Sequence, residues 1–265
     1  MNTVTKLGTA LITGASTGIG AIYADRLAKR GYDLILVARD QSKLQNVADK
    51  IKADYGNNVE VIPADLTSKV DLKRIEERLR SDSNITLLLN NAGLGATTKL
   101  VDSNLDDLER MIYLNVTTLT RLSGAAVPGF VSRGKGAVIN IASVVALAPE
   151  LLNGAYSGSK AYVVNFTQSM HHELSDKGIK VQAVLPGAID TPFWDKSGLP
   201  VQHLPTQIVM TPESLVDAAL AGFDLGEIIT IPSLPDITQW DALDAARKVL
   251  APNLSHTVPA SRYLN

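Results

Sequence analysis

Cysteine is absent from this chain of 265 residues. Without thiols there is no disulfide, no cysteine nucleophile and no thiolate ligand for a metal ion. The chain also has few histidines, and their spacing does not suit a metal. They are His171, His172, His203 and His256. The sequence therefore predicts no metal site.

The chain also lacks a dominant charge and a long hydrophobic run. Its 25 basic side chains face 27 acidic ones, a balance that speaks against nucleic acid as a partner. The longest apolar stretch, 137–149, contains Asn140 and Ser143 and is shorter than the roughly 20 residues that a membrane span requires. The N-terminus holds no apolar segment long enough for a signal sequence. We expect a cytoplasmic protein that does not bind membranes.

Short apolar runs alternate with segments of helical periodicity along the chain. This alternation is typical of an α/β fold in which helices cover both faces of a parallel sheet. The expected strands are 9–13, 33–38, 59–63, 86–90, 137–141, 180–185 and 227–231. Two long helices are expected over 104–133 and 155–176. No change in composition marks a domain boundary before Ala188, and the sequence predicts a single domain over 1–265.

A glycine-rich turn follows the first expected strand directly: Thr13-Gly14-Ala15-Ser16-Thr17-Gly18-Ile19-Gly20. Glycines allow a tight turn and the close approach of a pyrophosphate. The N-terminus of the next helix supplies free N–H groups and a partial positive charge. Because the turn lies between a strand and a helix, we expect it to bind a dinucleotide, with a simple packing turn as the alternative.

The residues after the second strand indicate which dinucleotide binds. About 20 residues beyond the glycines, where NAD-binding chains carry an acidic residue, stand Arg39 and Asp40. A guanidinium there can pair with a 2′-phosphate, so NADP(H) is favoured over NAD(H). In the alternative, Arg39 is only a surface cation and Asp40 binds the ribose hydroxyl one position late.

Tyr156 and Lys160 are four residues apart in an expected helix, so both side chains project from one face. A neighbouring ammonium lowers the pKa of a phenol from its usual value of about 10, which makes the tyrosine a general acid or base. A Tyr and a Lys at this spacing also occur by chance. The other motifs therefore decide how the pair is interpreted.

Taken together, these motifs resemble the short-chain dehydrogenase/reductase family in order and spacing over about residues 7–191. The matching residues are the glycine-rich turn, Asp65-Leu66, Asn90-Asn91-Ala92-Gly93, Asn115, Ser143, Tyr156-x-x-x-Lys160 and Pro186-Gly187. The resemblance implies a Rossmann-like, doubly wound sheet of seven parallel strands. It also implies a homo-oligomer, a dimer or a tetramer, joined through the two long helices.

The resemblance also implies the role of each residue. Tyr156 exchanges a proton with the substrate oxygen, Lys160 lowers the tyrosine pKa and holds the nicotinamide ribose, and Ser143 hydrogen-bonds the substrate oxygen. Asn115 helps to anchor a water chain. Alone, Ser143 would be the polar end of a strand and Asn115 a buried residue in need of a partner. The implied cofactor-binding residues are Gly14, Ser16, Thr17, Gly18, Ile19, Gly20, Arg39, Asp65, Leu66, Asn91, Ala92, Gly93, Tyr156, Lys160, Pro186, Gly187, Ile189 and Thr191.

The irregular segment 188–210 is too long for a plain connection, and we expect it to form a lid over the substrate. The expected pocket residues are Val145, Asn153, Phe193 and Trp194. This mostly apolar set predicts a small to medium hydrophobic ketone or aldehyde, reduced reversibly to the alcohol. The alternatives are a 3-oxoacyl-thioester or steroid reductase and a non-catalytic NADP(H)-binding regulator. Segment 233–265 is expected to form a turn and an amphipathic helix that closes the pocket or packs against a second subunit.

Overall fold

The protein, described from a computed structural model, has defined structure over residues 7–197 and 199–264. Expectations that concern residues 1–6, Gly198 and Asn265 lie outside the described residues. The chain divides into two compact units, a main unit that ends at Pro232 and a C-terminal unit that begins at Ser233.

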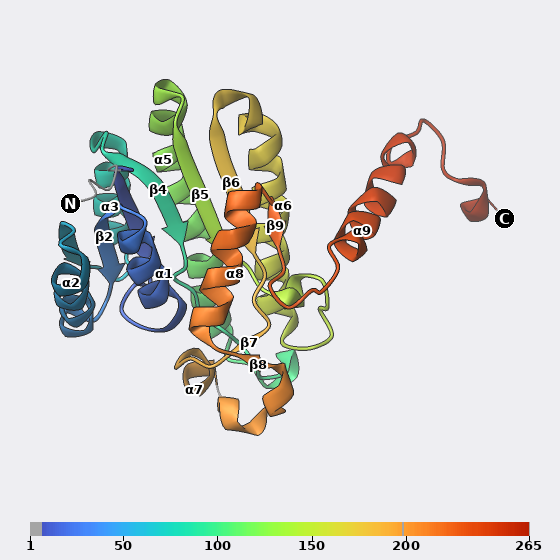
Figure 1. Ribbon diagram of the computed structural model, residues 1–265. Helices are drawn as coiled ribbons and strands as arrows, with labels where there is room; N and C mark the ends of the chain where they lie inside the picture. Colours follow the sequence, from blue (N-terminus) through green and yellow to red (C-terminus); the bar gives the residue numbers. More distant parts are fainter. Residues whose placement is uncertain (1–6, 198, 265) are drawn as a thin grey trace. The chain divides into compact units, whose positions relative to one another are not determined.

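A parallel sheet of seven strands forms the centre of the main unit, in the order β3-β2-β1-β4-β5-β6-β9 (Figure 1). The expected architecture is confirmed, although β9 is shorter than the sequence pattern indicates. The strands are β1 (Thr9–Thr13), β2 (Asp33–Ala38), β3 (Val59–Pro63), β4 (Ile85–Asn90), β5 (Gly136–Ile141), β6 (Ile179–Val184) and β9 (Ile229–Thr230). A separate parallel pair joins β7 (Ala188–Ile189) to β8 (Val209–Met210).

Helices cover both faces of this sheet. On one face lie α1 (Gly18–Lys29), α2 (Gln41–Tyr55) and α8 (Pro212–Leu225); on the other lie α3 (Lys69–Ser81), α5 (Leu119–Arg133) and α6 (Gly154–Leu174). Successive side chains of a strand point to opposite faces, so Ala10 and Ile12 of β1 enter one core while Leu11 enters the other. Both faces are buried, which is why most side chains of the strands are apolar.

The long helix expected over 104–133 contains a change of helical type. It begins as α4 (Leu105–Ile112), passes into a π-helical segment, η2 (Tyr113–Thr118), and continues as α5. In a π-helical segment the backbone hydrogen bonds span five residues instead of four, and such segments are frequent at functional sites. Asn115, one of the expected catalytic residues, lies in this segment.

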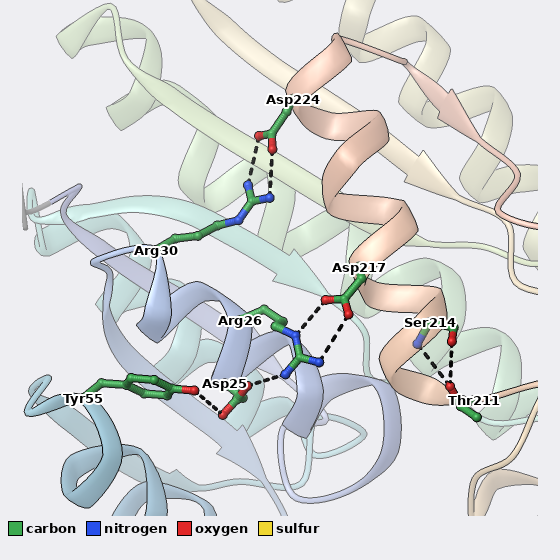
Figure 2. Close-up of polar contacts among 8 residues, drawn as sticks. All are labelled: Asp25, Arg26, Arg30, Tyr55, Thr211, Ser214, Asp217 and Asp224. Atoms are coloured by element: carbon green, nitrogen blue, oxygen red, sulfur yellow. Dashed lines mark hydrogen bonds and ion pairs between the residues drawn. The ribbon is translucent and has the colours of Figure 1, made fainter.

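Two ion pairs on the surface join α1 to α8 (Figure 2). Arg30 donates to both carboxylate oxygens of Asp224 at 2.9 and 2.8 Å. Arg26 donates through Nε to Asp217 at 2.7 Å. These contacts join the helix that begins in the glycine-rich turn to the helix that follows the expected lid segment.

The C-terminal unit contains α9 (Thr238–Val249) and two short 3-10 turns. The expected helix is confirmed. Asp244 pairs with Arg247 and with Lys248, each at 2.7 Å, and Leu243 is half exposed. None of the α9 side chains is buried.

Candidate active site

The strand order of the sheet reverses between β1 and β4, and open α/β sheets bind ligands at such a point. A cavity of about 550 Å³ opens there, beyond the carboxyl ends of the strands. Seventeen of the eighteen residues expected to bind the cofactor line this cavity, and Gly20 is the exception. The structure therefore brings together residues that lie between positions 14 and 191.

Gly20 acts in packing instead. A Cβ atom on Gly20 would lie 2.3 Å from the carbonyl oxygen of Gly14 and 2.6 Å from Nδ2 of Asn91. Only glycine lets α1 cross the turn this closely. Gly14 itself has a φ of +67°, which favours glycine. The amide of Asn91 donates to the carbonyl oxygens of Thr13 and Gly14, so Asn91 joins the end of β4 to the turn.

The N-terminus of α1 is open to an anion. Its N-cap residue, Thr17, makes no capping hydrogen bond through its side chain. By contrast, five other helices of the main unit begin with a side-chain cap: Asp40 for α2, Ser68 for α3, Asn104 for α4, Asn153 for α6 and Thr211 for α8. The first N–H groups of α1 therefore remain available beside the cavity, and they fit the pyrophosphate of a dinucleotide.

The strand order gives the cavity two chemically different ends. Arg39 and Asp65 follow β2 and β3, whereas Lys160 meets β5, on the far side of β1 and β4. Adjacent strands are about 4.8 Å apart, so β2 and β5 are separated by roughly 15 Å. This separation suits a dinucleotide that places one nucleoside at each end.

At the Arg39 end, Asp40 is engaged in capping α2. Its Oδ1 atom accepts hydrogen bonds from the backbone N–H of Lys43 at 3.0 Å and from Oγ of Ser42 at 2.8 Å. The backbone hydrogen bond from Lys43 is the main cause that holds the pKa of Asp40 below its usual value. A carboxylate used in this way is poorly placed to bind a ribose hydroxyl, which disfavours the alternative in which Asp40 selects NAD(H).

At the other end, Tyr156 and Lys160 are buried on one face of α6, as expected. The Lys160 Nζ atom lies 5.8 Å from the centre of the Tyr156 ring and donates to the carbonyl oxygen of Ile141 at 3.0 Å. Burial lowers the pKa of Lys160 to about 8. Burial also raises the pKa of Tyr156 to about 12, and a hydrogen bond with Ser143 acts in the opposite direction. The expected lowering of the tyrosine pKa is therefore wrong for this geometry, because desolvation of the phenolate dominates.

Ser143 is buried where the chain leaves β5. Its Oγ atom donates to the carbonyl oxygen of Pro186 and accepts from the N–H of Val145, both at a long 3.4 Å. These weak contacts leave the hydroxyl able to reorient toward a better partner. Ser143 does not line the cavity by itself, and it reaches the site through its hydrogen bond with Tyr156.

Asn115 joins the loop after β4 to the catalytic helix. Its Oδ1 atom accepts from the N–H of Leu94 at 2.9 Å, and its Nδ2 atom donates to the carbonyl of Leu94 at 2.9 Å and to Oγ of Ser159 at 3.1 Å. A buried asparagine needs such partners. Ser159 is adjacent to Lys160, so Asn115 fixes this part of α6 relative to the cavity.

The expected lid contributes two aromatic side chains to the cavity. Phe193 lies 6.2 Å from the Tyr156 ring, and Trp194 packs edge-on against Phe193 at 5.9 Å. The indole N–H of Trp194 donates to the carbonyl of Ile189 at 2.9 Å. Both ends of the lid are fixed because Ile189 of β7 pairs with Met210 of β8.

Two expected pocket residues do not line the cavity. Val145 packs against Tyr156 in a small apolar cluster. Asn153 caps α6 by accepting from the N–H of Ala155 at 2.8 Å, and it donates to the carbonyl of Thr98 at 2.6 Å. The neighbouring Leu152 lines the cavity instead. Sequence reasoning also missed Lys43, Leu94, Arg110 and Leu114. For Lys43, a basic residue four positions after Arg39 was the available signal.

Two further features are absent from the part of the chain that the structure describes. In residues 7–197 and 199–264, no three acidic or histidine side chains are grouped to hold a metal ion. Over the same residues, no helix is both long enough and apolar enough to span a bilayer.

Comparison with known proteins identifies related sequences and structures. A short-chain dehydrogenase from Sphingobium yanoikuyae, solved in complex with NADPH, is 48% identical with a TM-score of 0.94, and the match covers 97% of this chain and 100% of that one. The bulky-bulky ketone specific alcohol dehydrogenase from Comamonas testosteroni is 44% identical with a TM-score of 0.91, covering 98% and 100%.

Curated relatives include very-long-chain 3-oxoacyl-CoA reductases. The protein from Anas platyrhynchos is 35% identical over 80% of this chain and 67% of its own length, and for the Bos taurus protein the shares are 71% and 63%. The chain thus spans about two thirds of these relatives. The family model for short chain dehydrogenase matches residues 8–200. With its fold and site geometry, this match shows that the chain belongs to the short-chain dehydrogenase family of oxidoreductases.

Proposed function

We propose that this protein is an NADP(H)-dependent carbonyl reductase that acts reversibly on a small to medium hydrophobic ketone or aldehyde. One observation carries the proposal: the phenol of Tyr156 is buried beside Ser143 at the apolar end of a cavity whose other end carries Arg39. A proton donor and a cofactor-selecting cation are thereby combined in one site.

The residues around the cavity fit NADP(H). The free N–H groups of α1 would receive the pyrophosphate, Arg39 would pair with the 2′-phosphate, and Lys160 would hold the nicotinamide ribose. The NADPH in the Sphingobium yanoikuyae relative supports this cofactor. When bound, the cofactor supplies the hydride for reduction.

The protein's own residues would manage the proton. As negative charge develops on the carbonyl oxygen, Tyr156 donates its phenolic proton to that oxygen and the Ser143 hydroxyl donates a hydrogen bond to it. With a pKa of about 12, Tyr156 is protonated at neutral pH, as a general acid for reduction must be. With a pKa of about 8, Lys160 is still mostly charged and stabilises the phenolate that forms. Asn115 would hold the loop and α6 in place and help to anchor the proton's return path.

The side chains at the Tyr156 end indicate a hydrophobic substrate. Leu94, Leu152, Phe193 and Trp194 contribute apolar or aromatic surface to the cavity at this end. The cations of the cavity other than Lys160 are Arg39, Lys43 and Arg110, and they accompany Asp40 and Asp65 at the opposite end. The substrate end thus offers little to the phosphates of an acyl thioester. The names of the curated relatives keep acyl-thioester and steroid reduction as the second candidate.

A substrate panel with a Tyr156→Phe control tests the proposal. Aryl ketones, acyl thioesters and steroids are assayed with NADPH, and turnover confined to acyl thioesters would rule out the proposed substrate class. In Tyr156→Phe, ketone reduction should fall by at least about 100-fold, because general acid catalysis contributes about that much or more. NADPH affinity, measured by fluorescence titration, should change little. Retained turnover in the variant would disprove the assigned acid. NADPH binding without turnover of any compound would favour a regulator.

A further inference from the structure

The Arg39 end of the cavity holds five charged side chains, which come from two helices and from the ends of two strands. The cations are Arg39, Lys43 and Arg110, and the carboxylates are Asp40 and Asp65. The carboxylates pair locally: Asp65 lies 3.8 Å from Arg110, and Asp40 lies 3.6 Å from Lys43. Removing Lys43 would leave as many carboxylates as cations. Lys43 therefore gives this end its net positive charge.

Because Asp40 is negatively charged, binding of a phosphate at this end requires the additional positive charge of Lys43. Its hydrogen bonds with the N–H of Lys43 and with Ser42 keep it ionised at the N-terminus of α2, directly after Arg39. A phosphate that pairs with Arg39 would meet this negative charge. Repulsion between like charges would cancel part of the attraction to the guanidinium unless a further cation intervenes.

Lys43 is placed to intervene. It lies one turn into α2, and long side chains on a helix point back toward the helix N-terminus, here toward Asp40 and the cavity. An ammonium group has three donors, so a contact with Asp40 leaves two for a ligand. The Lys43 side chain is 56% exposed, which leaves its tip free to move between partners.

We propose that Lys43 is a second cofactor-selecting residue, whose ammonium neutralises Asp40 and binds the 2′-phosphate of NADP(H) together with Arg39. This inference rests on the proposed cofactor. A phosphate monoester carries a charge of about −1.5 to −2 at neutral pH, so one guanidinium alone would leave it incompletely paired. The 2′-hydroxyl of NAD(H) carries no charge and gains nothing from Lys43.

Ligands that differ only in the 2′-phosphate test this directly. Dissociation constants for NADPH, NADH, adenosine 2′,5′-bisphosphate and AMP are measured by calorimetry on the full chain. Lys43→Ala should weaken both 2′-phosphate ligands by about 10-fold, a size typical of losing one charge-assisted contact, and change NADH and AMP by less than about 2-fold. Lys43→Arg should keep most of the affinity. Arg39→Ala is the positive control. Lys50→Ala, on the same helix but away from the cavity, controls for net charge.

Asp40→Asn separates the two parts of the proposal, because asparagine still caps a helix. In the Asp40→Asn background, Lys43→Ala should cost less NADPH affinity than it costs in the parent. Equal weakening of NADPH and NADH by Lys43→Ala, or no weakening of either, would overturn the role of Lys43 and leave the proposed function intact. If the parent itself binds NADH as tightly as NADPH, the proposed cofactor fails before Lys43 is considered.

Discussion

Lys160 shows how function at one residue opposes stability. Its ammonium is enclosed by protein, and its one described hydrogen bond is to the carbonyl of Ile141. Burial lowers its pKa to about 8 because removal from water disfavours the charged form. The site therefore keeps a charge that folding alone would not select, and stabilisation of the Tyr156 phenolate offers a reason for it.

Lys160→Met should stabilise the fold while it abolishes activity. Between pH 8 and about 10.4 the unfolded chain binds more protons at Lys160 than the folded chain, so the parent gains stability as pH rises through this window. Below pH 8, burial of the charged Lys160 side chain destabilises the parent by on the order of 3 kcal/mol. The variant avoids this cost but loses the hydrogen bond to Ile141, which is worth about 1 kcal/mol. Urea unfolding at pH 7 should show Lys160→Met more stable by about 1 to 2 kcal/mol. A gain that persists unchanged at pH 9.5 would contradict this linkage.

The sequence predicts side-chain roles least well where a residue acts on a neighbouring residue rather than on a ligand. The spacing of Tyr156 and Lys160 predicts their shared helix face, because that depends only on local geometry. The same spacing does not predict the raised pKa of Tyr156, since burial depends on Val145 and on Phe193 from the lid. Asn153 is expected in the substrate pocket, and only the structure shows that it caps α6.

At the scale of elements, the N-terminus of α6 joins the loop after β4 to the catalytic residues. Asn153 accepts from the N–H of Ala155, one residue before Tyr156, and donates to Thr98 O and Ser103 Oγ at 2.6 and 3.1 Å. One buried side chain thus fixes the start of the catalytic helix and the loop after β4 to each other.

Asn153→Ala should therefore lower kcat as well as stability. Loss of a helix cap and of buried hydrogen bonds costs about 1 to 3 kcal/mol of unfolding free energy. A small shift of Tyr156 should reduce kcat by about 10-fold or more. NADPH affinity should change much less, because most of the cofactor residues lie on elements other than α6. The matched control is Thr211→Ala, which removes the cap of α8, on the opposite face of the sheet. If both variants lose stability equally and neither loses kcat, Asn153 is only a cap.

Element prediction from the sequence succeeded where burial leaves a pattern. Strands that are covered on both faces read as apolar runs, so six of the seven were expected within about one residue of their ends. The π-helical segment around Asn115 could not be predicted, because the longer span of its hydrogen bonds leaves no pattern in the sequence. The strands β7 and β8 could not be predicted either, because two residues are too few to show an alternation of apolar and polar side chains.

At the scale of the whole molecule, the chain divides into two compact units after Pro232, where the expected C-terminal extension begins. The described apolar cores draw their side chains from residues up to Phe223. The C-terminal unit carries exposed apolar side chains on and beyond α9: Leu243, Val249, Leu250, Leu254, Val258, Tyr263 and Leu264.

A chain that ends at Pro232 should fold and keep its cofactor site. Every residue that lines the cavity precedes this point, and deletion removes no side chain of the described cores, which therefore stay complete. For a unit of this size, a change of 1 kcal/mol shifts the melting temperature by about 2 to 4 °C, and we expect no larger shift. Calorimetry gives the melting temperature, titration the NADPH affinity, and sedimentation of both chains at one concentration the oligomeric state. A drop well beyond this range together with a smaller assembly would mean that the C-terminal unit stabilises contacts between copies. A drop at unchanged mass would mean that it belongs to the same cooperative unit as the sheet.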